Sequence, residues 1–244
     1  MLESVIDILP RLLDGLSKTL ILLVMSSTLS FPLAVVMALA YLSSNRLASG
    51  IAKSYLVIFR GTPALVQLYF IYYGFSMSEW MRESWSWVLF ESAWFCGVLA
   101  LTLNTAAYQT EIFRGALQAV PPGLVDAARS LGLSRLQLFF LVRFPAAIRL
   151  ALPAYGNELI LLAKATSIVS TITILDLMGM AKLIYTETFD PFAPLLTAAA
   201  LYLLLVWGMQ LAVSGVEIYL MPHMRHDLRQ PPGSRLFKLG RQTR

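Results

Sequence analysis

The sequence predicts an all-α integral membrane protein with about five transmembrane helices. Only 14% of its residues are charged, and its mean hydropathy is +0.68. Several apolar runs are close to the roughly 20 residues that a helix needs to cross a bilayer. These runs occupy most of the chain and leave little length for a soluble domain. We therefore expect residues 1–244 to form a single domain with a membrane core over about 19–221.

The chain begins with an amphipathic segment at residues 2–18. Its apolar side chains share one helical stripe and its charged side chains the other, which predicts a helix along the membrane interface, broken or bent at Pro10. Residues 19–42 form the first predicted span, with a kink at Pro32. Residues 43–53 are predicted to be a short basic connection.

The second predicted span, residues 55–75, is interrupted by the sequence Arg60-Gly61-Thr62-Pro63. Backbone groups freed by such a break must be satisfied by protein or by a water-filled cavity, which points to a transport pathway. The alternative is that Arg60 only marks the edge of the membrane.

The rest of the chain continues the alternation of apolar spans and polar segments. These are, in order, an acidic loop with three tryptophans (76–92), a third span (93–107), a polar island (120–145), a fourth span (154–180), an acidic loop (181–194), a fifth span (195–221) and a basic tail (222–244).

Charge placement predicts the orientation. On one side of the predicted bundle, the segments 43–60, 109–150 and 222–244 carry 14 lysines and arginines and three acidic residues. On the other side, the segments 1–18, 76–92 and 181–194 carry 4 lysines and arginines and eight acidic residues. Because basic loops remain in the cytoplasm, the amino terminus is expected outside and the carboxyl terminus inside. The pI near 9.4 follows from this topology and does not indicate nucleic-acid binding.

The polar island is predicted to contain two short helices. Two prolines and a glycine end the preceding helix, and about two turns of helix follow before Gly132, which suits a left-handed cap. Ser134 is placed to cap a second short helix, which Pro145 is expected to end.

The first of these helices has the character of a docking element. Ala127 and Ala128 leave one side nearly free of bulky side chains, so that side can lie close to another surface, and Asp126 and Arg129 add one charge of each sign. An ordinary cytoplasmic loop is the alternative interpretation.

The sequence lacks the motifs of common enzyme classes. It contains no GxxxxGK[ST], HExxH or GxSxG pattern, and its only two histidines lie in the basic tail. The single cysteine, Cys96, cannot form an internal disulfide. We therefore expect no enzymatic activity, no catalytic residues, no metal site and no cofactor.

The island resembles a known docking motif. Asp126-Ala127-Ala128, three residues, Gly132, nine residues, Val142, one residue and Phe144-Pro145 are similar to the cytoplasmic EAA loop of ATP-binding-cassette (ABC) import permeases, with Asp126 in place of Glu and Phe144 in place of Leu. The stretches FRGTPALVQL, LNTAAYQTEIFRGAL, ARSLGLS and LPAYGNELILLAKATS resemble the polar and basic amino acid permeases, which include histidine, arginine and opine permeases.

The resemblance implies a type I ABC importer permease fold in a bacterial inner (plasma) membrane. It implies a cytoplasmic ABC ATPase dimer, a second permease subunit that is identical or paralogous, an external substrate-binding protein and an amino acid substrate. It also gives the coupling loop, 120–145, its residues: Asp126, Ala127, Ala128, Gly132 and Pro145.

Four polar residues in the predicted spans are candidates for substrate binding. An intramembrane carboxylate favours a cation by charge pairing in a low dielectric, so Glu158 is the candidate counter-ion of a cationic side chain. Asn157, Asn104 and Gln67 would supply hydrogen bonds. The alternative for Glu158 is an ion pair with Arg149 or Lys164 of a neighbouring turn or of a neighbouring subunit.

Two other functions fit an apolar helical bundle. A secondary amino acid transporter would also carry intramembrane charges, but it usually has more spans or an inverted repeat, and none is found in this sequence. A non-transporting membrane scaffold would leave the polar residues of the spans without a role.

Overall fold

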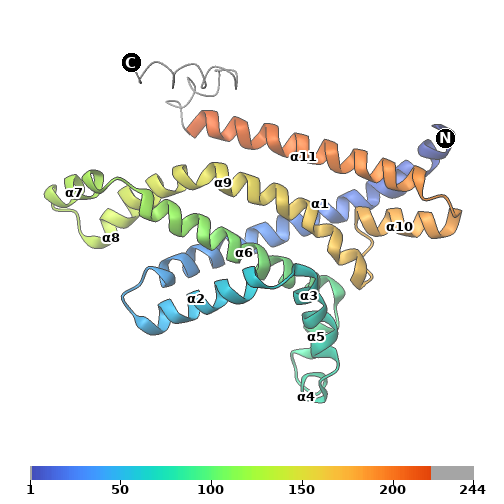
Figure 1. Ribbon diagram of the computed structural model, residues 1–244, viewed down its shortest axis with the longest axis horizontal. Coiled ribbons are helices and arrows are strands. Elements are labelled where there is room, and N and C mark those ends of the chain that lie inside the picture. The colour runs from blue at the N-terminus through green and yellow to red at the C-terminus, as the bar shows by residue number, and fades with distance from the viewer. Residues whose placement is uncertain (1, 221–244) are drawn as a thin grey trace, which may run out of the picture.

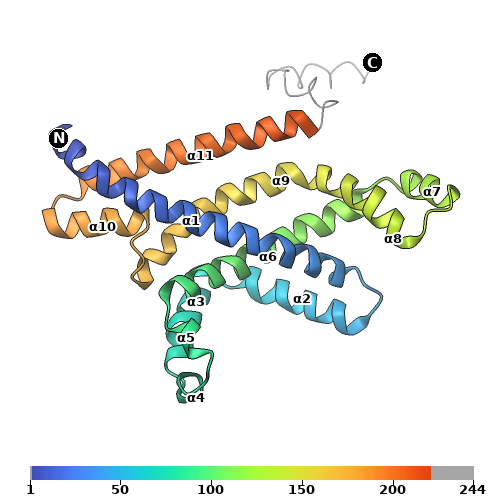
Figure 2. The ribbon, with the colours of Figure 1, turned by 180° about the vertical axis from the view of Figure 1, so that it is seen from behind.

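The computed structural model describes residues 2–220, and in these residues every regular element is a helix. Residues 222–244, predicted to form a basic cytoplasmic tail, lie outside the described residues. The predicted all-α class is confirmed. Figures 1 and 2 show an elongated bundle with α6 (Ala93–Ala119) at its centre, flanked by α1 (Leu2–Tyr41) and α9 (Phe144–Ala165), with α11 (Phe192–Leu220) outermost.

Five segments cross the described part of the bundle in alternating directions. By length and composition three helical stretches can span a membrane, Ile6–Tyr41, Arg135–Ile172 and Phe192–Leu220, and the bent pair Arg46–Gly61 with Ala64–Gly74 makes a fourth. The helix α6 has 27 residues, about 40 Å, which is also long enough. It is less apolar because α1 and α9 enclose it. In Figure 1 the α1–α2 turn, α7 and the end of α11 lie at one end of the bundle and α10 at the other.

The predicted break at Pro10 is wrong, because α1 runs without interruption from Leu2 to Tyr41. Proline removes one backbone hydrogen bond from a helix, but tertiary packing can hold the flanking turns in line. Ile8 and Leu12 are buried in a cluster with residues of α10 and α11. Arg11 also forms a two-pronged ion pair with Glu187 of α10, with its shorter N···O distance at 2.6 Å. This pairing lowers the pKa of the Glu187 carboxyl.

Small residues bring α1 and α6 close together. Every fourth position of α1 from Ser26 to Ala38 is fully buried, and each is serine or alanine. On α6, Ala106, Ala107 and Thr110 are equally buried, and the Thr110 hydroxyl donates a hydrogen bond to the carbonyl of Ala34 at 3.4 Å. Small residues let the two helices approach closely. Inside a bilayer, where the hydrophobic effect does not drive helices together, the resulting van der Waals packing stabilises their association.

The interruption predicted in the second span is confirmed. The helix α2 (Arg46–Gly61) and the continuation α3 (Ala64–Tyr69) with η1 (Phe70–Gly74) meet at an angle of 106°. We call this bend, with Thr62 and Pro63 at its corner, the elbow. The predicted basic connection at 43–53 is mostly helix, since α2 starts at Arg46 with Asn45 as its cap. The acidic loop contains the short helices α4 (Glu79–Arg82) and α5 (Trp87–Phe90), which project from the bundle in Figure 1.

The island folds as predicted at its start and differently at its end. The helix α7 (Pro122–Ser130) is followed by Gly132 at φ +77°, and Ser134 forms a reciprocal cap with Gln137 at α8 (Arg135–Gln137). The prediction that Pro145 ends this helix is wrong. The π-helical turn η2 (Leu138–Arg143) leads directly into α9, so the helix continues through Pro145, and the wider π turn lies directly before the proline that cannot donate a backbone hydrogen bond.

The fourth span ends earlier than predicted. After α9 the chain tightens into the 3₁₀ helix η3 (Thr166–Ile172), turns at Thr173 with φ +72°, and restarts as α10 (Leu177–Thr188), which occupies most of the predicted acidic loop. The cause is a run of hydroxyl side chains. Those of Thr166, Ser167, Ser170 and Thr171 each donate to the carbonyl three residues earlier, at 2.6–2.8 Å, which competes with the α-helical pattern.

Gly156 is the point of closest approach between α9 and α11. A Cβ atom at this position would lie 2.3 Å from Cγ1 of Val213, whereas a Cβ at Gly115 of α6 would meet nothing within 4 Å. Valine is stiff at χ1, so it cannot move aside without shifting α11.

The substitution Gly156→Ala should therefore lower the melting temperature of the purified protein, at a cost of about 1–3 kcal/mol from overpacking. Gly115→Ala is the control and should leave the melting temperature unchanged or raise it, because alanine is the better helix former. Adding Val213→Ala to Gly156→Ala should restore most of the loss. Equal melting temperatures for the two glycine variants would contradict this packing.

Candidate functional site

A pocket of about 240 Å³ lies between α6 and α9. Asn104, Thr105 and Tyr108 line it from α6, and Glu158 lines it from α9. The remaining lining residues, also from α9, are apolar: Leu161, Leu162 and Ala165. One carboxylate, one amide and two hydroxyl groups thus share an otherwise apolar wall, as expected of a site for a small polar solute. We call this the polar pocket.

Glu158 has no hydrogen bond or ion pair in the part of the chain that the structure describes. Neither Arg149 nor Lys164, its alternative partners from the sequence, approaches within ion-pair distance in the described residues. Six residues of helix turn about 600°, so Lys164 points well away from Glu158. A half-buried carboxylate in a membrane span that lacks a partner in the described residues is a candidate for a functional site.

Arg60 supplies a positive charge near the polar pocket. It lies in the last turn of α2, and its guanidinium carbon is 5.5 Å from the centre of the Tyr108 ring. One of its nitrogens, Nη1, is 3.9 Å from Oε2 of Glu111, and its charge also acts on Glu158. Arg60 is therefore a partly exposed residue that lies against α6 through Tyr108 and Glu111, and this contact favours the pathway interpretation over the membrane edge.

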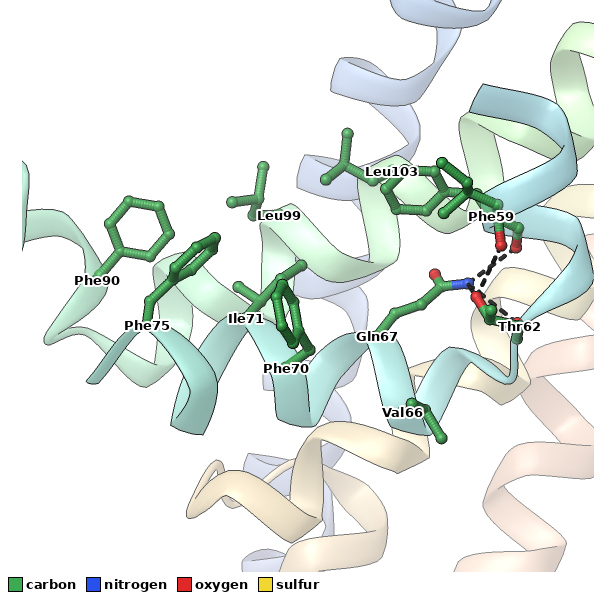
Figure 3. A pocket seen from close by; sticks show the side chains of 11 residues that line it. Phe59, Thr62, Val66, Gln67, Phe70, Ile71, Phe75, Phe90, Leu99 and Leu103 are labelled. Atoms are coloured by element: carbon green, nitrogen blue, oxygen red, sulfur yellow. Dashed lines mark hydrogen bonds between the residues drawn. The ribbon is translucent and has the colours of Figure 1, made fainter. Parts of the chain in front are cut away.

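The side-chain amide of Gln67 forms its hydrogen bonds with the elbow and with Asn104. Its Nε2 donates to the carbonyls of Phe59 at 2.9 Å and Thr62 at 3.0 Å and to the Thr62 hydroxyl at 2.8 Å, as Figure 3 shows. Its Oε1 accepts a hydrogen bond from Asn104 Nδ2 at 3.0 Å. Both ends of the amide are thus used within the chain, so Gln67 fixes Asn104 and does not line the polar pocket.

The larger cavity beside Gln67 is apolar. It has a volume of about 520 Å³ and lies in the angle between α2, α3 and α6, as seen in Figure 3. Four phenylalanines are among its lining residues: Phe59, Phe70, Phe75 and Phe90. It contains no charged group, so it cannot pair with a charged solute.

Of the four predicted substrate residues, Asn104 and Glu158 meet in the polar pocket. Gln67 touches Asn104 from behind, and Asn157 is exposed on a different face of α9 and does not line the pocket. The sequence analysis did not assign Tyr108 and Arg60 to the site. The signal for Tyr108 was present, because it follows Asn104 by four residues and so shares its helical face.

The coupling loop presents a mixed surface at one end of the bundle. Asp126 and Arg129 form an exposed ion pair at 3.1 Å. Ala127 is exposed, but Ala128 is only 4% exposed, so the two alanines do not form one bare face as predicted. Consecutive helical residues are about 100° apart, which turns Ala128 inward. Ala127 and its charged neighbours Asp126 and Arg129 are therefore the exposed part of this face of α7.

Arg143 connects the coupling loop to the end of α6, the central helix of the bundle. Its Nε and Nη2 donate to the carbonyl of Leu117 at 3.4 and 3.2 Å, near the end of α6. This interaction also satisfies one of the carbonyls that a helix end leaves without a partner.

Comparison with known proteins identifies the architecture. Residues 30–222 match the profile of the family described as binding-protein-dependent transport system inner membrane component. The chain belongs to this family. It is 43% identical over 225 residues to the nopaline transport system permease protein of Agrobacterium fabrum, which covers 92% of this chain and 93% of that one. It is 42% identical over 192 residues to the histidine/lysine/arginine/ornithine permease protein of Salmonella typhimurium, with 78% and 82% covered.

A solved relative has the same fold. A chain of an amino acid ABC transporter, crystallised with histidines, superimposes with a TM-score of 0.78 at 36% identity, and the match covers 88% of this chain and 96% of that one. The predicted type I importer fold is therefore confirmed. A chain of a methionine ABC transporter in an inward-facing conformation shares the fold, with a TM-score of 0.72 at 19% identity.

Family membership confirms the expected function of the chain and its expected location. The chain is a permease subunit of a bacterial inner-membrane ABC importer, and it is not the enzyme of the system, because ATP hydrolysis belongs to a partner ATPase. A substrate-binding protein and an ATPase are the partners that the family implies. This family membership excludes the two alternative functions, a secondary transporter and a non-transporting scaffold.

Substitutions at Gly132 test whether the conformation of the coupling loop matters for its function. With φ at +77°, valine should resist this conformation at a cost of about 1–2 kcal/mol, whereas asparagine adopts it readily. Gly132→Val should insert into the membrane normally but retain less ATPase on co-purification and support less uptake. Gly132→Asn is the matched control and should resemble the wild type. Wild-type uptake by Gly132→Val would show that the loop conformation matters little.

Proposed function

We propose that this chain is the permease subunit of an importer of polar, cationic amino acids or opines. The observation that carries the proposal is the Glu158 carboxylate, which faces the polar pocket without a protein partner in the described residues. Relatives named for nopaline, arginine, and histidine, lysine, arginine and ornithine transport support this substrate class. Each of these solutes is small enough to enter from an external binding protein.

In the proposed site, Glu158 pairs with the cationic group of the substrate. Asn104 supplies hydrogen bonds, and its Nδ2 is already directed by Gln67 and by the Phe59 carbonyl at 3.3 Å. This leaves the Asn104 Oδ1 as the acceptor for a substrate N–H group. Gln67 thus acts through Asn104, and Asn157 lies off the pocket and makes no contact with substrate.

The proposed assembly follows from the two ends of the bundle. The basic end carries the coupling loop, where Asp126, Ala127, Gly132 and Pro145 belong to the surface that docks on a cytoplasmic ATPase dimer, with Ala128 packed behind it. The acidic loop at 76–92 belongs to the outer side, where a substrate-binding protein delivers its cargo. A second permease subunit, identical or paralogous, completes the pathway.

The counter-ion role predicts a change in selectivity. In Glu158→Gln, uptake of lysine or arginine through the complete transporter should fall by about tenfold or more, since a hydrogen bond to a charged group contributes about 1.5–3 kcal/mol. Uptake of a neutral amino acid such as glutamine should change little, so the ratio of the two rates is the measurement.

The control is Glu217→Gln, which removes a carboxyl from α11 away from the polar pocket. It should leave the ratio at its wild-type value. An unchanged preference for cationic over neutral amino acids in Glu158→Gln would exclude the counter-ion role.

A further inference from the structure

We infer that Arg60 is a second substrate-binding residue, which takes the carboxylate of the same molecule whose cationic group faces Glu158. The inference rests on the proposed function, because it assigns a role to the cation that lies next to the polar pocket. Glu158 of α9 lines the pocket, and Arg60 of α2 lies against the ring of Tyr108, the α6 residue that lines the same pocket.

The first argument is the number of free donors on Arg60. A guanidinium carries five N–H groups, yet Arg60 makes no hydrogen bond in the described residues. Its one ionic contact is the 3.9 Å approach to Glu111. That carboxylate is already held by Arg114, which donates to both of its oxygens. Arg60 is therefore a weakly engaged second cation, and its donors are available to another carboxylate.

Two arginines that join helices, Arg11 and Arg143, differ from Arg60 in their hydrogen bonding. Arg11 donates two hydrogen bonds to Glu187, and Arg143 donates two to one carbonyl of α6. Both fix one helix to another. A loosely held arginine with 41% of its side chain exposed, placed above an aromatic ring at the edge of a pocket, is instead suited to bind and release a ligand.

The chemistry of the substrate supplies the partner. Amino acids and opines all carry a carboxylate, and a planar guanidinium binds a carboxylate through two parallel hydrogen bonds. Glu158 alone would accept any small amine. Arg60, beside the Tyr108 wall of the pocket, adds a requirement for a carboxylate, so the two residues together recognise a molecule that carries both charges.

The Tyr108 ring explains how Arg60 stays near the pocket without a strong ion pair. The ring faces the guanidinium at 5.5 Å, within the range of a cation–π interaction. Because Tyr108 also lines the pocket, a substrate that contacts its hydroxyl lies close to the Arg60 donors.

The test compares arginine or octopine, whichever binds the wild type more tightly, with agmatine, which is arginine without its carboxylate. Binding is measured by calorimetry on the purified complex of this chain with its permease partner and ATPase, without the binding protein. The wild type should prefer the carboxylate-bearing ligand by about tenfold or more, and Arg60→Gln should lose most of this preference while agmatine affinity is unchanged.

Two further variants separate this role from a structural one. Lys53→Gln removes a cation from the same helix, one that also faces an aromatic ring, Tyr41 at 5.4 Å, and it should retain the preference. Glu111→Gln should retain it too, since Glu111 only holds Arg60 loosely. Loss of the preference in Glu111→Gln would mean that Arg60 joins α2 to α6, and would overturn the inference.

The outcomes also separate the inference from the function on which it rests. If the wild type prefers the carboxylate and Arg60→Gln keeps that preference, Arg60 has no part in recognition, while the proposed function stands. If the wild-type complex binds neither arginine nor octopine, both the inference and the proposed substrate class are wrong.

Discussion

The elbow between α2 and α3 is the constraint on which the rest of the site depends. A helix that breaks at membrane depth frees backbone carbonyls, and in the absence of water each unpaired group costs several kcal/mol. Pro63 makes the break unavoidable because it cannot donate to the preceding turn. The carbonyls of Phe59 and Thr62 are satisfied by the amides of Gln67 and Asn104, so the bend exists only with those two side chains in place.

The hydrogen bonds that satisfy these carbonyls also link the elbow to the polar pocket. Asn104 belongs to α6, and its Nδ2 is used by the elbow while the same residue lines the pocket. One turn earlier along α2, the Tyr55 hydroxyl donates to the carbonyl of Leu103 at 2.6 Å. These contacts fix the end of α2 against α6, and they carry Arg60 to the ring of Tyr108. The position of the cation is thus a consequence of how the broken helix satisfies its backbone.

The sequence predicted the features that depend on composition and local geometry. The apolar spans, the break at Arg60 to Pro63, the left-handed Gly132 and the cap at Ser134 all follow from local rules. The predictions that failed involve proline, tertiary contacts and a run of hydroxyl side chains that ends the fourth span early. Pro10 was expected to break a helix that buried neighbours hold straight, and Pro145 was expected to end a helix that continues through it.

The roles of polar side chains were harder to predict, because a polar residue in a span can serve either the solute or the backbone. Gln67 and Asn104 have the same chemistry, yet Gln67 is consumed by the elbow and Asn104 keeps one oxygen for the pocket. Asn157 and Glu158 are adjacent, and a rotation of about 100° decides which one faces α6. No pattern in the sequence fixes that rotation, since α9 contacts several helices at once.

The continuity of α9 through Pro145 determines how motion at the coupling loop would reach the substrate. From Pro145 to Glu158 the helix is unbroken over 13 residues, about 20 Å, so a displacement at one end moves the other. Arg143 also joins the loop to the end of α6, the helix that carries Asn104 and Tyr108. Both walls of the polar pocket therefore end at the surface proposed to meet the ATPase. A movement of the loop that changes the spacing of α6 and α9 changes the distance between Glu158 and the opposite wall, and a substrate held by charges on both sides would be released by that change alone.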